Sequence, residues 1–131
     1  METSGEMVRS YRDLRVWVRG MDLAEMVYKL VALLPREEVF GLRSQLTRAA
    51  VSVPCNIAEG QGRMGDREFA QFLRVARGSL TELQTLLELV SRVKLIPEES
   101  VAPVHIVADD VGKMLTGLLA RISRDLQRSP S

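Results

Sequence analysis

Residues 45–63 constrain the fold of this chain more than any other stretch. Apolar residues recur there at helical spacing, but Pro54 lies in the middle of the pattern. A proline inside a helix removes one backbone hydrogen bond and crowds the carbonyl four residues earlier, at a cost of about 3 kcal/mol. The pattern predicts a helix that begins near Glu37, bends around Pro54 and ends at Glu59, with Gly60 as its left-handed cap.

Apolar periodicity predicts three further helices, one before this stretch and two after it. The first follows Asp13 and runs to Pro35, the next runs from Asp66 as the N-cap to about Leu95, and the last runs from about Ser100 to Gln127, with Pro103 in its first turn. The chain has no long alternating apolar runs and no Asn-Gly or Asp-Gly turns, so no strands are expected.

Four long helices with short connections predict an all-α fold, an up-down-up-down antiparallel four-helix bundle. The length of 131 residues suits one domain and is enough to bury a core without disulfides or a metal. We therefore expect a single domain over residues 1–131, with residues 1–10 and 128–131 as loose ends.

The composition points to a protein of the cytoplasm. Cys55 is the one cysteine, so no intramolecular disulfide can form, which suits a reducing compartment. The first six residues are acidic and lack the apolar core of a signal peptide. No apolar run reaches the roughly 18 residues that span a bilayer, so we expect no membrane partner.

The first predicted helix carries two apolar stripes, rotated by about 110° from each other at 100° per residue. One stripe is Leu14, Trp17, Met21, Ala24, Tyr28 and Val31, and the other is Val16, Leu23, Val27, Leu30 and Leu34. One stripe can face the core of the bundle. The other needs a second cover, either a neighbouring helix or another subunit, and on this ground we expect a homo-oligomer.

Catalysis is not expected, because no constellation of reactive side chains is present. His105 is the one histidine and has no cysteine or second histidine near it in sequence. Cys55 could be a nucleophile beside Pro54, but a single cysteine in an apolar helix is more often a packed small hydrophobe. Asp109 and Asp110 are adjacent and point to different faces of a helix. We predict no catalytic site, no metal and no cofactor.

A small polar set lies on the two middle helices. Asn56 and Glu59 share one helix face at a spacing of three, and Ser79 and Glu82 do the same. One interpretation is a shared ligand or RNA site. The other is a buried hydrogen-bond network that fixes the register of the helices, which we prefer because buried polar groups normally pair.

Arginine dominates the basic residues, with 15 Arg against 3 Lys. Many follow helical stripes: Arg9, Arg12, Arg15 and Arg19; Arg63, Arg67, Arg74 and Arg77; and Arg121, Arg124 and Arg128. In an up-down-up-down bundle these stripes fall at the same end. Residues 1–20, 45–78 and 115–131 hold 12 arginines and 7 acidic residues, a net +5, and the other segments hold 6 basic and 10 acidic residues, a net −4.

Five short pieces of sequence carry a resemblance to a known bacterial family. They are residues 13–17; residues 27–30 with Pro35; residues 38–42 with Gln45; residues 52–60 with Arg63; and residues 76–83. On these pieces, which cover residues 11 to about 95, the chain resembles the 23S ribosomal RNA intervening-sequence proteins. It is also similar to their relatives, the accessory variability proteins of diversity-generating retroelements.

The resemblance implies a four-helix bundle that assembles as a ring, commonly a homopentamer, without enzyme activity. For the retroelement relatives it implies binding to nucleic acid and to a reverse transcriptase. Thr47 stands where the family commonly has an arginine, which weakens the nucleic-acid hypothesis slightly.

Two hypotheses for function follow. In the first, a homo-oligomer binds structured RNA or DNA, or a nucleoprotein, through phosphate contacts. Its predicted contact residues are Arg12, Arg15, Arg19, Arg63, Arg67, Arg74, Arg77, Arg121 and Arg124. In the second, the protein is an adaptor that docks a partner enzyme, such as a reverse transcriptase, without touching nucleic acid. Independently of the adaptor hypothesis, the alternative to phosphate contacts is that the arginines are solvated or paired with acids of adjacent subunits.

Overall fold

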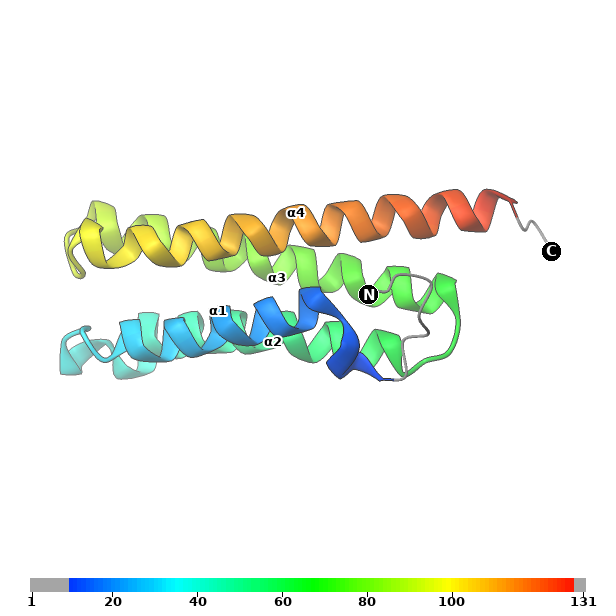
Figure 1. Ribbon diagram of the computed structural model, residues 1–131. Helices are drawn as coiled ribbons and strands as arrows, with labels where there is room; N and C mark the ends of the chain where they lie inside the picture. The colour runs from blue at the N-terminus through cyan, green and yellow to red at the C-terminus, as the bar shows by residue number, and fades with distance from the viewer. Residues whose placement is uncertain (1–9, 129–131) are drawn as a thin grey trace.

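The computed structural model describes residues 10–128, which form four long helices and no strand (Figure 1). The helices are α1 Arg15–Val31, α2 Ser44–Gln61, α3 Asp66–Arg92 and α4 Glu98–Arg128. The connections alternate between the two ends of the molecule, so consecutive helices are antiparallel. The predicted all-α, up-down-up-down bundle is confirmed over this range.

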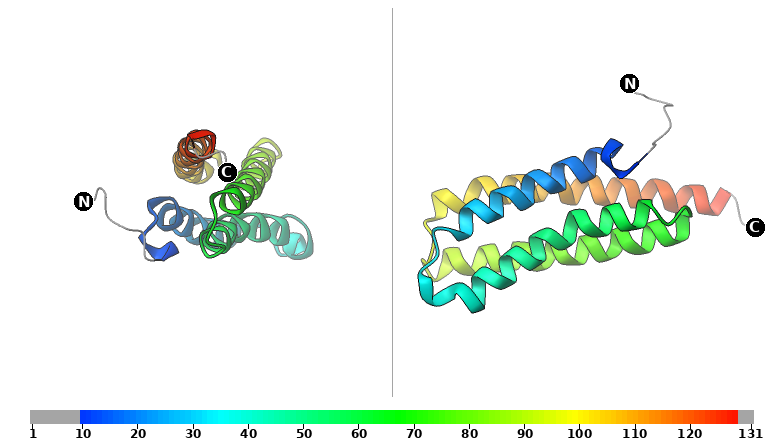
Figure 2. Two further views of the ribbon diagram at one scale, coloured as in Figure 1. Left: turned by 90° about the vertical axis from the view of Figure 1, so that its right-hand side faces the viewer. Right: turned by 90° about the horizontal axis from the view of Figure 1, so that it is seen from below.

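The helices form two layers, with α1 and α2 in one and α3 and α4 in the other (Figure 1). Each helix packs against two neighbours, α1 and α3 both lying against α2 and α4. Figure 2 shows the bundle end-on and from below. α1 and α3 begin at the end where α2 and α4 finish. This end is called the arginine end below.

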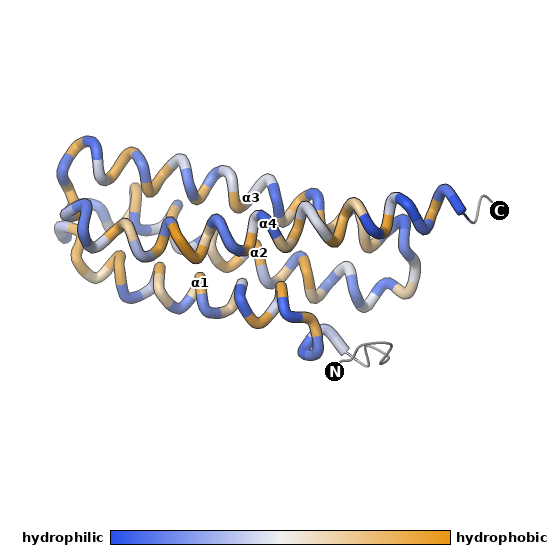
Figure 3. The backbone as a smooth tube through the Cα atoms, turned by 45° about the horizontal axis from the view of Figure 1, so that its top comes forward, coloured by the Kyte–Doolittle hydropathy of each residue, from blue (hydrophilic) through white to orange (hydrophobic). Residues whose placement is uncertain are grey.

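The core runs the length of the bundle, where hydrophobic residues recur along each helix (Figure 3). Every helix supplies large side chains with no solvent exposure, among them Leu23, Leu46, Leu73 and Leu115. Burying a leucine side chain contributes roughly 1.5–3 kcal/mol. The periodic apolar residues of four helices thus account for the fold without any crosslink.

The two apolar stripes of α1 have different surroundings. Val16, Leu23, Val27, Leu30 and Leu34 are all buried in the bundle core. In the other stripe Ala24 and Val31 are buried, but the Met21 and Tyr28 side chains are 45% and 58% exposed. The bundle therefore covers one stripe completely and the other only in part.

The first helix begins at Arg15, two residues after Asp13, because Asp13 belongs to a separate turn. Ser10 caps a 3-10 turn at Tyr11–Asp13, and the backbone N–H of Ser10 donates to the Asp13 carboxylate at 3.3 Å. α1 then begins at Arg15 and ends at Val31, four residues before Pro35.

The second helix begins later than the predicted Glu37. Residues Arg36–Glu38 form a 3-10 turn and Val39–Arg43 a π-helical turn. Gly41 lies outside the helical region, with φ −107° and ψ −106°, so a regular α-helix starts only at Ser44. α2 then runs through Pro54, which is buried, to Gln61.

The prediction that Gly60 is a left-handed cap is wrong. Gly60 lies inside α2 and is buried. A Cβ atom there would lie 2.6 Å from the Cβ of Phe72, so the glycine permits close packing of α2 on α3. The left-handed conformation in this connection belongs to Met64, with φ 61°.

The ends of α3 and α4 differ from prediction by a few residues. Gly65, with φ −160°, is the N-cap of α3, and Asp66 is its first residue, where a carboxylate favours the helix dipole. At the other end Lys94 takes φ 63°, and its N–H bonds to the Ser91 carbonyl while that of Leu95 bonds to Val90. This is a Schellman motif with lysine in the position that glycine usually takes.

α4 begins two residues earlier than predicted, at Glu98, so Pro103 lies in its second turn rather than its first. The expected loose ends fall mostly outside the described residues. Of them the structure describes Ser10, which caps a turn, and Arg128, the last residue of α4.

Candidate nucleic-acid interface

The topology brings the arginine stripes of α1, α3 and α4 to one end, as predicted. Ser52 and Ser79 are in contact, so the midpoint of α2 lies near residue 52 and Arg48 belongs to the other half of the bundle. Over the described residues, the arginine-end half comprises 10–20, 53–78 and 115–128. It holds ten arginines and five acidic residues, a net +5, and the other half holds seven basic and ten acidic residues, a net −3.

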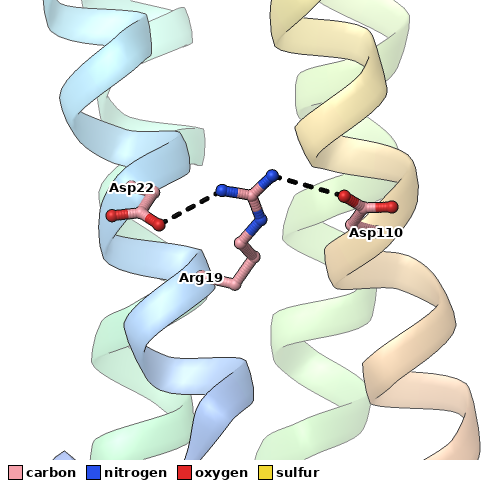
Figure 4. A network of polar contacts seen from close by, with 3 residues as sticks. All are labelled: Arg19, Asp22 and Asp110. Atoms are coloured by element: carbon pink, nitrogen blue, oxygen red, sulfur yellow. Dashed lines mark hydrogen bonds and ion pairs between the residues drawn. The ribbon is translucent and has the colours of Figure 1, made fainter.

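Arg19 already has two carboxylate partners within the protein. Its guanidinium bridges α1 to α4, donating to the carboxylates of Asp22 and Asp110 at 3.3 Å each (Figure 4). Half-buried at the middle of the bundle, Arg19 links two helices, and its predicted contact with phosphate stays a prediction.

Two further arginines are held by their neighbours. Arg63 donates to the Glu59 carboxylate at 2.6 Å, and its guanidinium lies 5.2 Å from the ring centre of Phe72. Arg12 lies 5.5 Å from the Tyr11 ring and 5.8 Å from the Trp17 ring. A cation above an aromatic face keeps its charge, so Arg12 stays available to an anion.

The six remaining predicted contact residues share one property: all are exposed, and none has a carboxylate partner within residues 10–128. They are Arg15, Arg67, Arg74, Arg77, Arg121 and Arg124. A guanidinium without a partner offers its full planar set of donors to an incoming phosphate. These six therefore remain candidates for phosphate contacts at the arginine end.

The structure does not gather them into one patch. Arg15 and Arg121 line a groove of about 430 Å³ between α1 and α4. Arg77 lines a second groove of about 600 Å³ between α3 and α4, together with Lys113. Lys113 was not among the predicted residues, because its segment belongs to the acidic part of the sequence. Lys113 lies eleven residues, or three helical turns, before Arg124, so the two fall on the same face of the helix. This spacing could have added Lys113 to the predicted residues.

The predicted polar set is only partly assembled. The Ser52 and Ser79 hydroxyls lie 2.7 Å apart, and the Asn56 amide donates to the Ser52 hydroxyl and carbonyl at 2.9 Å and 2.8 Å. This half-buried cluster links α2 to α3 through Ser52, which sequence reasoning missed. Glu59 pairs with Arg63 on the surface instead, and Glu82 is exposed without a polar contact in the described residues.

An apolar groove of about 630 Å³ lies between α1 and α2. Its lining includes Trp17, Met21, Tyr28, Pro54 and Cys55. Cys55 is exposed, contrary to the prediction that it is packed in the core. The incompletely covered stripe of α1 thus forms one wall of an open apolar surface.

The described residues contain neither a candidate metal-binding cluster nor a candidate membrane-spanning helix. Within 10–128, no three His, Cys, Asp or Glu side chains are grouped so that they could hold a metal ion. None of the helices in that range combines the length and apolar character that a membrane span requires. His105 lies half-buried on α4.

The fold and surface define a class, the small four-helix bundle proteins, here with one basic end. The family model of the 23S rRNA-intervening sequence protein matches residues 12–117, and the chain belongs to this family. The match extends the resemblance from residue 95 into α4 and stops before Arg121. The similarity to retroelement proteins stays a prediction.

A crystal structure of a protein with unknown function from the S23 ribosomal protein family, from Bacteroides thetaiotaomicron, shares the fold with a TM-score of 0.72. The two chains are 21% identical, and the match covers 79% of this chain and 97% of that one. Among curated proteins no match was found.

Proposed function

We propose that the protein is a non-enzymatic homo-oligomer that binds structured nucleic acid, or a nucleoprotein, through its arginine end. The observation that carries the proposal is the set of exposed, unpaired arginines at that end, six of which were identified above. Arginine binds phosphate oxygens with two parallel hydrogen bonds, and phosphate contacts supply most of the non-specific affinity for nucleic acid.

The homo-oligomer part of the proposal is supported by the apolar groove between α1 and α2. Met21 and Tyr28 stay 45% and 58% exposed in it, and a contact with another subunit would remove that surface from water. A ring of parallel subunits, a pentamer by resemblance, would set the arginine ends side by side. The rim would then concentrate positive charge and attract phosphates over a longer range.

Binding to a hairpin RNA and to duplexes of RNA and DNA, measured at about 50 mM and 200 mM salt, tests the nucleic-acid part. We expect binding at low salt that weakens steeply at the higher salt, and similar affinities for unrelated sequences of the same shape. Absence of binding at low salt would contradict the proposal.

The apolar groove also favours a second candidate, an adaptor that docks a partner protein there, such as a reverse transcriptase. Sedimentation of the chain by itself separates the two. A homo-oligomer covers its own groove, whereas an adaptor keeps it open for another protein. A monomer at micromolar concentration would count against the homo-oligomer and favour the adaptor.

A further inference from the structure

The groove between α3 and α4 has the chemistry of a phosphate site. Its two cations come from different helices, Arg77 from α3 and Lys113 from α4. Thr116 adds a hydroxyl from α4, whereas the Thr81 hydroxyl of α3 donates to the Arg77 backbone carbonyl at 3.1 Å. We infer that this groove binds phosphate groups, and that the backbone of a bound nucleic acid runs along it. The second part of the inference rests on the proposed function.

The charges within the groove favour an anion. Neither Arg77 nor Lys113 has a carboxylate partner in residues 10–128. Asp109 is the one acidic side chain of the lining, and it accepts a hydrogen bond from Gln84 at 2.9 Å. Because α3 and α4 are antiparallel, Gln84 and Asp109 mark the part of the groove away from the arginine end. The part nearer to that end holds both cations.

The backbone at this part of the groove is accessible. A Cβ atom added at Gly117, which lines the groove, would meet nothing within 4 Å. Gly117 therefore leaves the edge of the groove free of a side chain beside the Thr116 hydroxyl. A phosphate oxygen can approach the two cations there without displacing a side chain. Space alone would not define a site, but here it adjoins two unpaired cations.

A second groove, between α1 and α4, also has two cations in its lining. Arg15 and Arg121 lie over apolar side chains of α1 and α4, which are Leu14, Val16, Met114 and Leu118. Asp13 lines that groove as Asp109 lines the groove between α3 and α4, but none of its lining residues carries a hydroxyl group. The groove between α3 and α4 is therefore the better phosphate site of the two.

Lys113 also extends the arginine stripe of α3. Arg67, Arg74 and Arg77 span about 15 Å along α3 at 1.5 Å per residue. Antiparallel packing places Lys113 about one helical turn beyond Arg77, because Gln84 faces Asp109. The cations form a track of about 20 Å from the arginine end to the middle of the bundle. Such a track suits successive phosphates of one strand.

A pair of lysine variants tests the inference. Lys113→Gln should weaken binding to a hairpin RNA by about threefold to tenfold at low salt and lower the salt slope by about one unit. Lys94→Gln removes the same charge from an exposed lysine at the opposite end, and should leave both values unchanged. Thermal unfolding of both variants at the wild-type temperature shows that the fold is kept. If Lys113→Gln binds as tightly as Lys94→Gln, the inference is overturned while the proposed function stands.

Inorganic pyrophosphate gives a readout that needs no nucleic acid. In amide NMR spectra we expect it to shift the signals of Thr116 and Gly117 in the wild type, and much less in Lys113→Gln. Shifts in the protein without any binding of RNA or DNA would overturn the proposed function and keep the phosphate site. Unshifted Thr116 and Gly117 signals would overturn the site itself.

Discussion

The guanidinium of Arg19 lies 3.3 Å from the Asp110 carboxylate and joins α1 to α4 at the middle of the bundle (Figure 4). A second carboxylate, that of Asp22, lies 3.3 Å from the same group. The Arg19 and Asp110 side chains are 37% and 44% exposed, so solvent screens the pair. Its main consequence is that the Arg19 guanidinium donates hydrogen bonds to carboxylates within the protein.

Replacing Arg19 with glutamine should therefore leave nucleic-acid binding nearly unchanged. Stability should fall by only about 0–1 kcal/mol, because partly exposed ion pairs contribute little. Arg15→Gln is the matched control, since Arg15 lies one turn earlier on α1 and has no carboxylate partner within the described residues. Binding isotherms and thermal unfolding check both values. A greater loss of affinity in Arg19→Gln than in Arg15→Gln would show that the ion pairs open on binding.

Gly60→Ala should destabilise the protein by roughly 1–3 kcal/mol, because its Cβ would lie 2.6 Å from that of Phe72. Gly78→Ala is the control, and its expected effect on the free energy of unfolding has the opposite sign. It lies inside α3 where an added Cβ meets nothing within 4 Å, so it should stabilise by about 0.5–1 kcal/mol. Denaturant unfolding measures both. Equal effects of the two substitutions would mean that α2 and α3 can move apart at Gly60.

Sequence patterns predicted the helices better than their ends, for physical reasons. The long periodic runs of apolar residues in α3 and α4 could be recognised as helices without knowing which helices pack against them. The ends depended on single residues whose role comes from packing. Gly60 stands in the sequence where a C-terminal cap is expected. The structure shows that a glycine is needed there because Phe72 of α3 packs against it. The sequence of α2 alone gives no indication of that contact. The start of α2 was misplaced because Gly41 breaks a run that is helical by composition.

The cluster of Ser52, Asn56 and Ser79 predicts a coupling between α2 and α3. Ser52→Ala should cost about 1–2 kcal/mol, because it removes one partner from both Asn56 and Ser79. Ser79→Ala should cost less, since Asn56 keeps its bond to Ser52. The double variant should then show a coupling energy of about 0.5–1.5 kcal/mol in unfolding experiments. Strict additivity would mean that the two hydroxyls contribute independently.

Glu59 should behave differently from this cluster. It pairs with Arg63 at the surface, where the two side chains are about half exposed, so Glu59→Ala should cost only about 0–1 kcal/mol. Asn56→Ala should cost roughly 1–3 kcal/mol. Thermal unfolding of the two variants compares them directly. A larger loss of stability in Glu59→Ala than in Asn56→Ala would support the buried network that the sequence predicted.

The apolar groove predicts a surface that self-association covers. Met21→Lys combined with Tyr28→Lys should dissociate the homo-oligomer, because burying two ammonium groups in an apolar contact is costly. Both positions are largely exposed, so the bundle itself should stay folded. Ile106→Lys, on α4 and 63% exposed, is the control that should keep the assembly. Sedimentation and circular dichroism give the two readouts. An unchanged oligomer in the double variant would place the contact elsewhere.

The candidate site shows a similar division between what sequence predicts and what it cannot. Helical spacing and antiparallel topology were enough to bring the arginines to one end. Which of them are free depended on neighbours from other helices. Arg19 meets Asp110, which lies 91 residues away, and Lys113 meets the groove of Arg77 only because α4 returns beside α3. Pairings at such separations are fixed by packing and are not visible in a single helical stripe.

The arginines of α3 should carry more of the salt dependence than those of α1. Replacing Arg67, Arg74 and Arg77 together with glutamine removes three exposed, unpaired charges and should lower the salt slope by about three units. The same change at Arg12, Arg15 and Arg19 should lower it by at most about two, because Arg19 is held by two carboxylates.

A third triple variant controls for the loss of charge itself. Arg36, Arg48 and Lys94 are exposed residues in the half away from the arginine end, and none is paired with a carboxylate in residues 10–128. Their replacement by glutamine removes the same three charges and should change the salt slope by less than about one unit. Affinity for a hairpin RNA and an unrelated duplex should fall in parallel for the α3 variant, since phosphate contacts carry no sequence information. Three equal slopes would mean that net charge attracts the nucleic acid and that the arginine end has no special part in binding it.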